Sequence, residues 1–308
     1  MTSPASPAAL RGIWPALLTP LRADLSIDHD RFAAHARSLV ERGCGGVTPF
    51  GTTGEGPSFT VAERRAAVDA LVAGRVPAAC ILVSTSCAAL PDALELTRHA
   101  VSIGAWGCLL MPPFFLKGVS DQGVIDSYRY VIDGVADARL RIMLYHIPQI
   151  SGVALSRDVI GTLQRLYPGT IVGIKDSGGQ IAHSGALAAA FMPPLGVHVG
   201  HEPDLPALAR RGSGGAVSGL ANLMPRLVGR LVSEPDSPRA VADLARVNRL
   251  LGWLGGYALT PALKAIMAAQ SGDSAWLRVR PPLLALDAAA FATFQRELPA
   301  FAIDPEAD

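Results

Sequence analysis

Lys175 is the residue in this sequence with the clearest potential for covalent chemistry. It ends the apolar run IVGIK at residues 171–175, in a chain with only three lysines against twenty-four arginines. Desolvation of a partly buried lysine favours the neutral amine, which can attack a carbonyl carbon and form a Schiff base. The resulting iminium can accept the electrons of a breaking C–C bond. The structural alternative is that the side chain reaches solvent and pairs with a carboxylate such as Asp176. The scarcity of lysine favours the chemical role.

Two other features could assist such an amine. The segment GTTGEG at 51–56 predicts a tight turn whose backbone N–H groups and two hydroxyls suit a carboxylate or an oxyanion. It matches neither the P-loop pattern nor the dinucleotide-binding pattern G-x-G-x-x-G. Tyr145 follows an apolar run and offers a phenol, although most tyrosines at strand ends are packing residues.

The elements that must position these groups are short apolar runs, each followed by a longer amphipathic stretch. Helical segments are expected at 28–43, 60–74 and 90–104, the second beginning with a capping box. The eight strand candidates are 13–18, 45–50, 79–84, 107–112, 141–146, 171–175, 196–200 and 214–219. This alternation predicts an α/β fold, a (β/α)8 TIM barrel, with a doubly wound open sheet as the alternative.

The chain is expected to divide into a flexible leader at 1–10, the barrel at 11–230 and a small C-terminal helical extension at 231–308 packed on the barrel. The formal charge of +1 gives no electrostatic case for binding nucleic acid. No apolar run is long enough for a membrane span, and no secretory signal is recognisable. The four cysteines show no metal-binding spacing, so we expect a cytoplasmic protein without a metal.

The barrel prediction has a functional consequence, because the active sites of such barrels lie at the C-terminal ends of the strands. Those ends are followed by polar residues in this sequence. They include the 51–56 turn, Tyr145, Lys175 with Ser177, and His201 with Glu202. We therefore expect one end of the barrel to hold the reactive groups.

The chain resembles the family of dihydrodipicolinate synthase and N-acetylneuraminate lyase, the pyruvate-dependent class I aldolases, over roughly residues 10 to 290. The matching motifs, in order, are G-T-T-G-E at 51–55, Y-x-x-P at 145–148, G-I-K-D at 173–176, GGAVSGLAN at 214–222 and VRPPL at 279–283. The resemblance implies a TIM barrel, a pyruvate Schiff base, no cofactor, and a homo-oligomer, either dimer or tetramer.

The resemblance also implies roles for individual residues. Lys175 matches the Schiff-base lysine, and Tyr145 matches the tyrosine that relays a proton to or from the substrate. Thr52 and Thr53 match the pair that assists the relay and binds the pyruvate carboxylate. Gly51 begins the same motif and is also expected to bind the substrate. The carbonyl of Val217 matches a backbone contact beside the lysine. Ser177, His201 and Glu202 are expected near the far end of the substrate.

Three departures from the family pattern bear on the substrate. Ile150 stands where the synthases have an arginine that binds the carboxylate of aspartate semialdehyde, and an apolar side chain cannot replace it. Phe115 stands where a second relay tyrosine is lent by a neighbouring subunit. Gly219 stands where a sialic acid lyase would have serine.

These observations favour a lyase that reversibly splits a 2-oxo-3-deoxy sugar acid, or a related 2-oxo acid, into pyruvate and an aldehyde. The alternatives within this chemistry are the synthase itself and a dehydratase of 2-oxo-3-deoxy sugar acids. A phosphosugar isomerase that uses GSGGAVSG at 212–219 as a phosphate cradle is a third possibility. A non-catalytic sensor of 2-oxo acids is a fourth.

Overall fold

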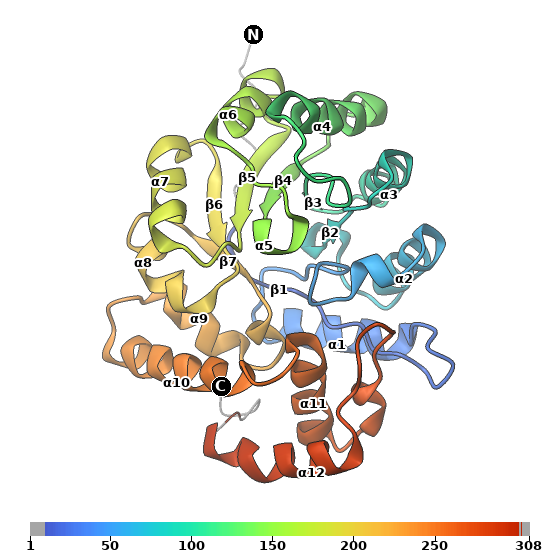
Figure 1. The fold of residues 1–308 in the computed structure, drawn as a ribbon, viewed down its shortest axis with the longest axis vertical. Coiled ribbons are helices and arrows are strands. Elements are labelled where there is room, and N and C mark those ends of the chain that lie inside the picture. Colours follow the sequence, from blue (N-terminus) through green and yellow to red (C-terminus); the bar gives the residue numbers. More distant parts are fainter. Residues whose placement is uncertain (1–9, 302, 304–308) are drawn as a thin grey trace.

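The computed structural model describes residues 10–301 and 303; all but Leu10 of the expected leader therefore lies outside the described residues. Seven strands of these residues surround a common interior (Figure 1). They are β1 (Gly12–Pro15), β2 (Leu82–Ser84), β3 (Gly107–Leu110), β4 (Ile142–His146), β5 (Ile171–Asp176), β6 (Gly196–Val199) and β7 (Gly215–Ser218).

The order of the strands shows a closed barrel. β2 to β6 form one parallel sheet in sequence order, and the first strand pairs in parallel with the last, β1 with β7. A doubly wound sheet is open, so its first and last strands would not meet in this sequential order. The (β/α)8 prediction is confirmed, and the open-sheet alternative is wrong.

The second predicted strand, at 45–50, is the exception. It contributes only two bridges, Ala16 with Thr48 and Val47 with Ile81, which link β1 to β2. Pro49 has no N–H to continue a ladder. The segment also starts with glycines packed against the first strand: a Cβ on Gly46 would lie 2.3 Å from the Trp14 ring. Close backbone approach therefore replaces a regular strand at this position.

Most helices of the repeating units form the outer layer in Figure 1, whereas the short α5 lies near the centre of the view, at the end of β4. The helices of these units are α1 (His29–Glu41), α2 (Val61–Ala73), α3 (Leu90–Ser102), α4 (Asp121–Val135), α5 (Pro148–Ser151), α6 (Arg157–Leu166), α7 (Ile181–Phe191), α8 (Leu205–Ala209) and α9 (Pro225–Ser233). The capping box of α2 is present, with Thr60 and Glu63 bonded reciprocally.

Three further helices follow in the described chain: α10 (Pro238–Leu254), α11 (Leu259–Ser271) and α12 (Ala288–Glu297). Aromatic rings join α10 to α12 and the turn after it, because the Trp253 ring lies 4.4 Å from that of Phe294 and 4.7 Å from that of Phe301, centroid to centroid. No helix in the described part of the chain is long and apolar enough to cross a membrane.

Alternation along the strands separates two sets of buried side chains. One set fills the space between the strands and the helices and includes Leu144 and Ile174. The other set faces the barrel interior and includes Trp14, Met143, Tyr145 and Val217. Tyr145 therefore points into the barrel.

Candidate active site

Tyr145 and Lys175 are neighbours across two adjacent strands. They are Cα partners in the parallel pairing of β4 with β5, and the next partners are His146 and Asp176. Because side chains alternate along strands, Tyr145 and Lys175 face the interior while His146 and Asp176 face the helix layer. The sequence spacing thus brings a phenol and an amine side by side.

The Lys175 amine is buried and has no ion-pair partner among residues 10–301 and 303. The residue is 5% exposed, and its Nζ lies 4.3 Å from the centroid of the Tyr145 ring. The Asp176 carboxylate is occupied elsewhere, accepting from the Gly178 N–H and the Ser184 hydroxyl and contacting His183 Nδ1. The structural alternative, in which Lys175 pairs with Asp176, is therefore wrong.

Gly200, directly after β6, leaves the space that the lysine occupies. A Cβ at this position would lie 2.9 Å from Lys175 Cε, 2.3 Å from Ser177 Oγ and 3.4 Å from the Val217 carbonyl oxygen. Lys175, Ser177 and the Val217 carbonyl thus converge around one glycine. Any larger residue would push the amine from its place.

The 51–56 turn brings hydroxyls to the same point. Thr52 Oγ1 lies 3.3 Å from the Tyr145 hydroxyl, and either oxygen can donate. The turn is too tight for side chains at its glycines, since a Cβ on Gly56 would lie 1.9 Å from the Phe50 carbonyl oxygen. The Gly51 carbonyl accepts from the Gly56 N–H, so Gly51 closes the turn.

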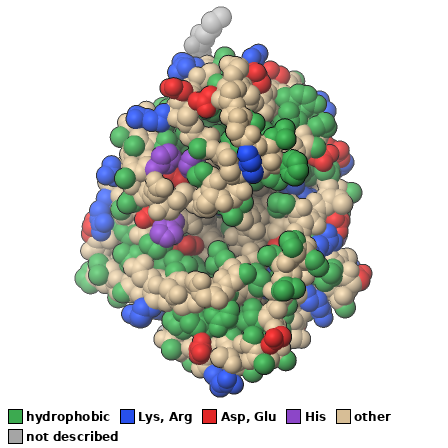
Figure 2. All heavy atoms as spheres, in the orientation of Figure 1, with side chains coloured by type: hydrophobic (Ala, Val, Ile, Leu, Met, Phe, Trp, Pro, Cys, Tyr) green, Lys and Arg blue, Asp and Glu red, His purple; other side chains and the backbone are tan. Residues whose placement is uncertain are grey.

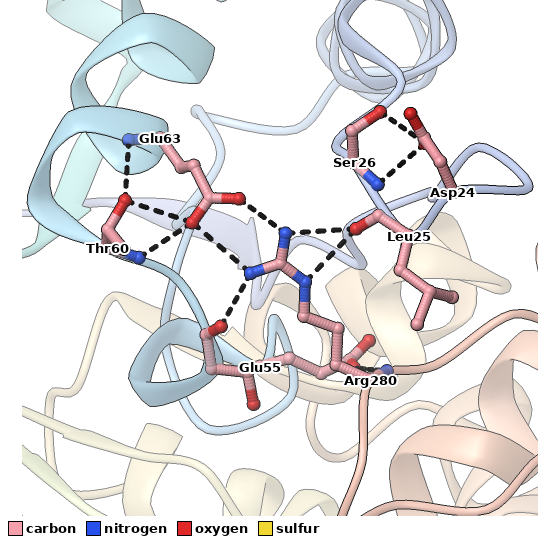
Figure 3. Close-up of polar contacts among 8 residues, drawn as sticks. Asp24, Leu25, Ser26, Glu55, Thr60, Glu63 and Arg280 are labelled. Carbon is pink, nitrogen blue, oxygen red and sulfur yellow. Dashed lines mark hydrogen bonds and ion pairs between the residues drawn. The ribbon is translucent and has the colours of Figure 1, made fainter.

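The turn is anchored from behind by buried charges. The Lys264 ammonium of α11 pairs with Glu55, and both side chains are fully buried. The backbone N–H of Arg280 donates to the other Glu55 oxygen at 3.1 Å. Figure 3 shows the Arg280 guanidinium reaching on to the Leu25 carbonyl and to Glu63 of α2. The VRPPL segment and α11 therefore hold the threonine turn against the barrel.

A cavity of about 220 Å³ opens where these groups meet. Eight of the nine predicted site residues line it: Lys175, Tyr145, Thr52, Thr53, Val217, Ser177, Glu202 and His201. Gly51 is not among the lining residues. The face drawn in Figure 2 is hollowed near its middle, with histidine side chains gathered beside the hollow.

Sequence reasoning missed part of the wall. Gln149 lines the cavity and donates from Nε2 to the Ser177 carbonyl at 2.6 Å, which leaves its amide oxygen as an acceptor. Leu251, Leu259 and Leu263 add an apolar surface from α10 and α11. Gln149 follows Tyr145 by four positions and could have been found from that spacing. Nothing in the sequence indicates that the C-terminal helices reach the strand ends.

Glu202 and His201, which are expected near the far end of the substrate, differ in whether their polar atoms are free to bind a ligand. Glu202 is buried, and its Oε1 accepts from the Ser218 hydroxyl at 2.6 Å and from the Leu220 N–H at 3.1 Å. His201 is exposed, and its Nδ1 lies 2.9 Å from an Asp204 oxygen. The other ring nitrogen of His201 remains available to a ligand, whereas Glu202 mainly holds the strand ends together.

Ile150 and Phe115 do not line the cavity. Ile150 is 55% exposed and Phe115 is 77% exposed. Lys117 ties their segments together, since its ammonium donates to the carbonyls of Phe114 and Ser151. Among the lining residues, Lys175 is the only lysine or arginine. The described residues around the cavity thus include no second lysine or arginine that could bind a carboxylate as the synthase arginine does.

Behind the cavity, His146, Asp176 and His183 lie close enough to hold a metal ion, with ligand atoms within 4.8 Å of one another. The hydrogen bonds oppose that use. His146 Nδ1 accepts from the Leu155 N–H, so a neutral ring has its proton on Nε2. Burial lowers the pKa of His146, which favours this neutral form. The third ligand, Asp176, already has the partners described above, so we assign no metal to the group.

The glycine-rich segment 212–219 is divided by the fold. Gly212 to Gly214 precede β7, at the end of the barrel opposite Lys175, while Gly219 follows the strand and lines the cavity. Hence the first glycines cannot cradle a phosphate at the C-terminal ends of the strands. The segment therefore provides no phosphate-binding site for a phosphosugar isomerase at the end of the barrel that holds Lys175.

Comparisons with known proteins agree on one family. Residues 9–300 match the model of the dihydrodipicolinate synthetase family. The chain is 35% identical to an uncharacterized DapA-like lyase of Chloroflexus aurantiacus, over 90% of this chain and 92% of the relative.

Solved structures show the same barrel. The crystal structure of dihydrodipicolinate synthase from Agrobacterium tumefaciens is similar with a TM-score of 0.87 and 32% identity, covering 95% of this chain and 99% of that one. YagE from E. coli, a prophage protein of the dihydrodipicolinic acid synthase family solved with pyruvate, is similar with a TM-score of 0.86 and 25% identity, covering 96% of this chain and 100% of that one.

Proposed function

Because this chain belongs to the dihydrodipicolinate synthetase family, we propose that it is a class I lyase that reversibly cleaves a 2-oxo-3-deoxy acid to pyruvate and an aldehyde. The observation that carries the proposal is the buried Lys175 amine, which pairs with no carboxylate of the described residues and lies over the Tyr145 ring. An amine in this state is suited to attack a carbonyl carbon rather than to stabilise the fold.

The chemistry follows from the groups around that amine. Lys175 Nζ adds to the 2-oxo carbon, and loss of water gives an iminium. Tyr145 takes the proton of the C4 hydroxyl, the C3–C4 bond breaks, and its electrons move into the iminium to form an enamine while the aldehyde leaves. Protonation at C3 and hydrolysis then release pyruvate and the free lysine. Thr52, 3.3 Å from the Tyr145 hydroxyl, is placed to pass the proton on.

The substrate carboxylate would lie against the 51–56 turn and Thr53, and the aldehyde part against the remaining lining residues. These combine Gln149, Ser177 and His201 with the leucines of α10 and α11. Neutral donors and acceptors suit hydroxyl groups, and the leucines suit carbon. We therefore propose a neutral hydroxyaldehyde, rather than an anionic one, as the second product.

The direct test is release of pyruvate from a panel of 2-oxo-3-deoxy acids, followed by coupling to lactate dehydrogenase. We expect turnover by the wild type and none by Lys175→Met. Lys117→Met is the matched control, because it removes a lysine outside the cavity and should keep the activity. Equal turnover by wild type and Lys175→Met would refute the proposal.

The synthase reaction is the second candidate, favoured by the 32% identity to a dihydrodipicolinate synthase. It requires an acceptor with its own carboxylate, and the described lining residues include no lysine or arginine besides Lys175. A missing charge-assisted hydrogen bond costs about 1.5–3 kcal/mol, which corresponds to roughly a 10- to 150-fold loss in kcat/KM. Glyceraldehyde should therefore be a better partner for pyruvate than aspartate semialdehyde. A tenfold preference for the semialdehyde would favour the synthase.

The same proposal includes self-association and a cytoplasmic location. Phe115, Leu116 and Ile150 are exposed apolar side chains on two segments joined by Lys117, a surface suited to a second copy of the chain. All four cysteines are free thiols, as a reducing compartment would keep them. Sedimentation at micromolar concentration should show a dimer or tetramer, and a monomer would contradict the proposed contact.

A further inference from the structure

A second, larger cavity lies at the opposite end of the barrel from Lys175. Its volume is about 630 Å³, and its wall includes Arg11 just before β1, Gly196 at the start of β6 and Gly214 just before β7. These positions mark the N-terminal ends of the strands. Nothing in the proposed lyase reaction uses this cavity, so its residues need a separate explanation.

The first observation is a buried histidine with an unused nitrogen. His198 is 2% exposed and lines the cavity, and its Nδ1 lies 3.0 Å from the Gly215 carbonyl oxygen. A carbonyl only accepts, so Nδ1 must bear the proton, and in the neutral ring Nε2 has a free lone pair. Nε2 is fully buried and has no hydrogen-bond partner within the described part of the chain.

Nε2 of His198 lies beside Gly196, which belongs to the cavity wall. A Cβ on Gly196 would lie 2.7 Å from Nε2, so the ring occupies space that only a glycine leaves open. Gly196 is itself part of the cavity wall. Burial lowers the pKa of His198, which keeps the ring neutral and Nε2 an acceptor. A buried acceptor without a partner is costly, and a ligand that donates a hydrogen bond would remove that cost.

The second observation is that two arginines line the same cavity. The guanidinium of Arg211 lies against α7, 3.1 Å from the position of a Cβ on Gly185, and that of Arg11 lies 3.6 Å from the position of a Cβ on Gly214. Neither guanidinium has a hydrogen-bond or ion-pair partner among the described residues. The rest of the wall is largely apolar, with Leu10, Met192, Pro193, Pro194 and Leu195.

We propose that this cavity binds a small organic anion with an apolar body and one O–H or N–H donor. The anionic group lies between Arg11 and Arg211, the apolar body contacts Met192 and the two prolines, and the donor reaches His198 Nε2. Gly212 and Gly214 add no side chains to the cavity wall, and the Ser213 hydroxyl between them donates to the Gly215 carbonyl. The first part of the segment that resembles a phosphate cradle in sequence thus belongs to an anion site at the other end of the barrel.

The probe is 2-hydroxy-4-methylpentanoate, which has a carboxylate, a hydroxyl donor and an apolar body. Two comparison probes each lack one feature: 4-methylpentanoate lacks the hydroxyl, and inorganic phosphate lacks the apolar body. Binding to the full chain is measured by calorimetry and by the methyl NMR signal of Met192, assigned with Met192→Leu. The signals of the other methionines report whether the effect is local.

We expect saturable binding of the hydroxy acid, a shift of the Met192 signal, and binding at least fivefold weaker for each comparison probe. Arg211→Gln should weaken binding by about tenfold or more, since it removes a charge-assisted hydrogen bond. Arg210→Gln is the matched control: it removes the same charge from the neighbouring residue, which pairs with Asp236 outside the cavity. Lyase turnover should be the same in both variants, because neither residue touches the catalytic cavity.

Three results would overturn the proposal. One is that none of the probes shifts the Met192 signal. Another is that both arginine variants weaken binding equally, which would indicate attraction by overall charge. The last is that the deoxy acid binds as tightly as the hydroxy acid, which would leave His198 without a role. Because these readouts do not depend on turnover, they hold whether or not the lyase proposal is correct.

Discussion

Replacing Lys264 with methionine should destabilise the protein strongly and specifically through Glu55. In the wild type the two side chains form an ion pair that solvent does not reach. Methionine keeps most of the apolar length of lysine but leaves the Glu55 carboxylate buried, with the Arg280 N–H as its only hydrogen-bond donor among the described residues. A buried charge without its counter-charge is the costly state.

The expected size follows from measured analogues and from chain length. Removing one partner of a buried pair costs about 3–5 kcal/mol. An unfolding entropy of roughly 2.1 cal/mol/K per residue amounts to about 650 cal/mol/K for 308 residues. The melting temperature should therefore fall by about 5–8 °C. The double variant Glu55→Gln, Lys264→Met leaves no unpaired charge and should recover at least half of that loss.

Differential scanning calorimetry of the wild type, both single variants and the double variant measures the coupling. Lys117→Met is the matched control, since that lysine donates to neutral carbonyls near the surface and should cost about 1 kcal/mol. A fall of less than 2 °C for Lys264→Met would refute the reasoning. So would a double variant whose loss equals the sum of the single losses, because the two charges would then act independently.

Three further predictions concern the catalytic cavity and its supports. Tyr145→Phe should still form a trappable pyruvate adduct but lose about 10²–10⁴-fold in kcat, measured by pyruvate release, because it lacks the proton relay; unchanged kcat would assign the relay to another group. Gly200→Ala would place a Cβ 2.9 Å from Lys175 Cε, so the rate of adduct formation, followed by mass spectrometry, should fall by about tenfold or more; a wild-type rate would mean that the site tolerates the methyl group. The Arg280 guanidinium is the main cause that lowers the pKa of Glu63 from 4.5 to about 2. The contribution of the ion pair between Glu63 and Arg280 to stability is therefore complete above pH 4.5 and lost as the pH falls towards 2. Denaturant unfolding should give Glu63→Gln a free energy of unfolding about 1–2 kcal/mol below that of the wild type at pH 6, after allowance for solvent screening. The difference should vanish near pH 2. A difference independent of pH would indicate a loss of packing instead.

The parts of the fold that follow from local patterns could be predicted from the sequence. Apolar runs ending in polar residues located β4 and β5 and placed Tyr145 and Lys175 at their ends. The Thr60 and Glu63 pair located the start of α2. Gly43 and Gly104, the last residues of the segments predicted at 28–43 and 90–104, follow α1 and α3 in the left-handed conformation that glycine adopts readily. After α2 the residue in this conformation is Arg75, one position beyond the predicted segment.

What the sequence could not predict depends on contacts between distant segments. The leucines of α10 and α11 reach the cavity only because those helices pack across the strand ends. The pairing of Glu55 with Lys264 joins residues more than 200 positions apart, and no local pattern indicates it. The hydrogen bonds from Ser218 and Leu220 to Glu202 were likewise not predictable, because these partners lie on a later strand and turn. Site residues near strand ends were predictable, whereas their supports were not.

The central claim is that Lys175 forms a Schiff base with pyruvate, and reductive trapping tests it most directly. The protein is incubated with pyruvate and borohydride, and the adduct is located by peptide mapping. The account predicts one reduced pyruvyl group per chain, attached to Lys175, and none in Lys175→Arg, whose guanidinium stays protonated. An adduct on Lys117 or Lys264, or an undiminished adduct in Lys175→Arg, would contradict it.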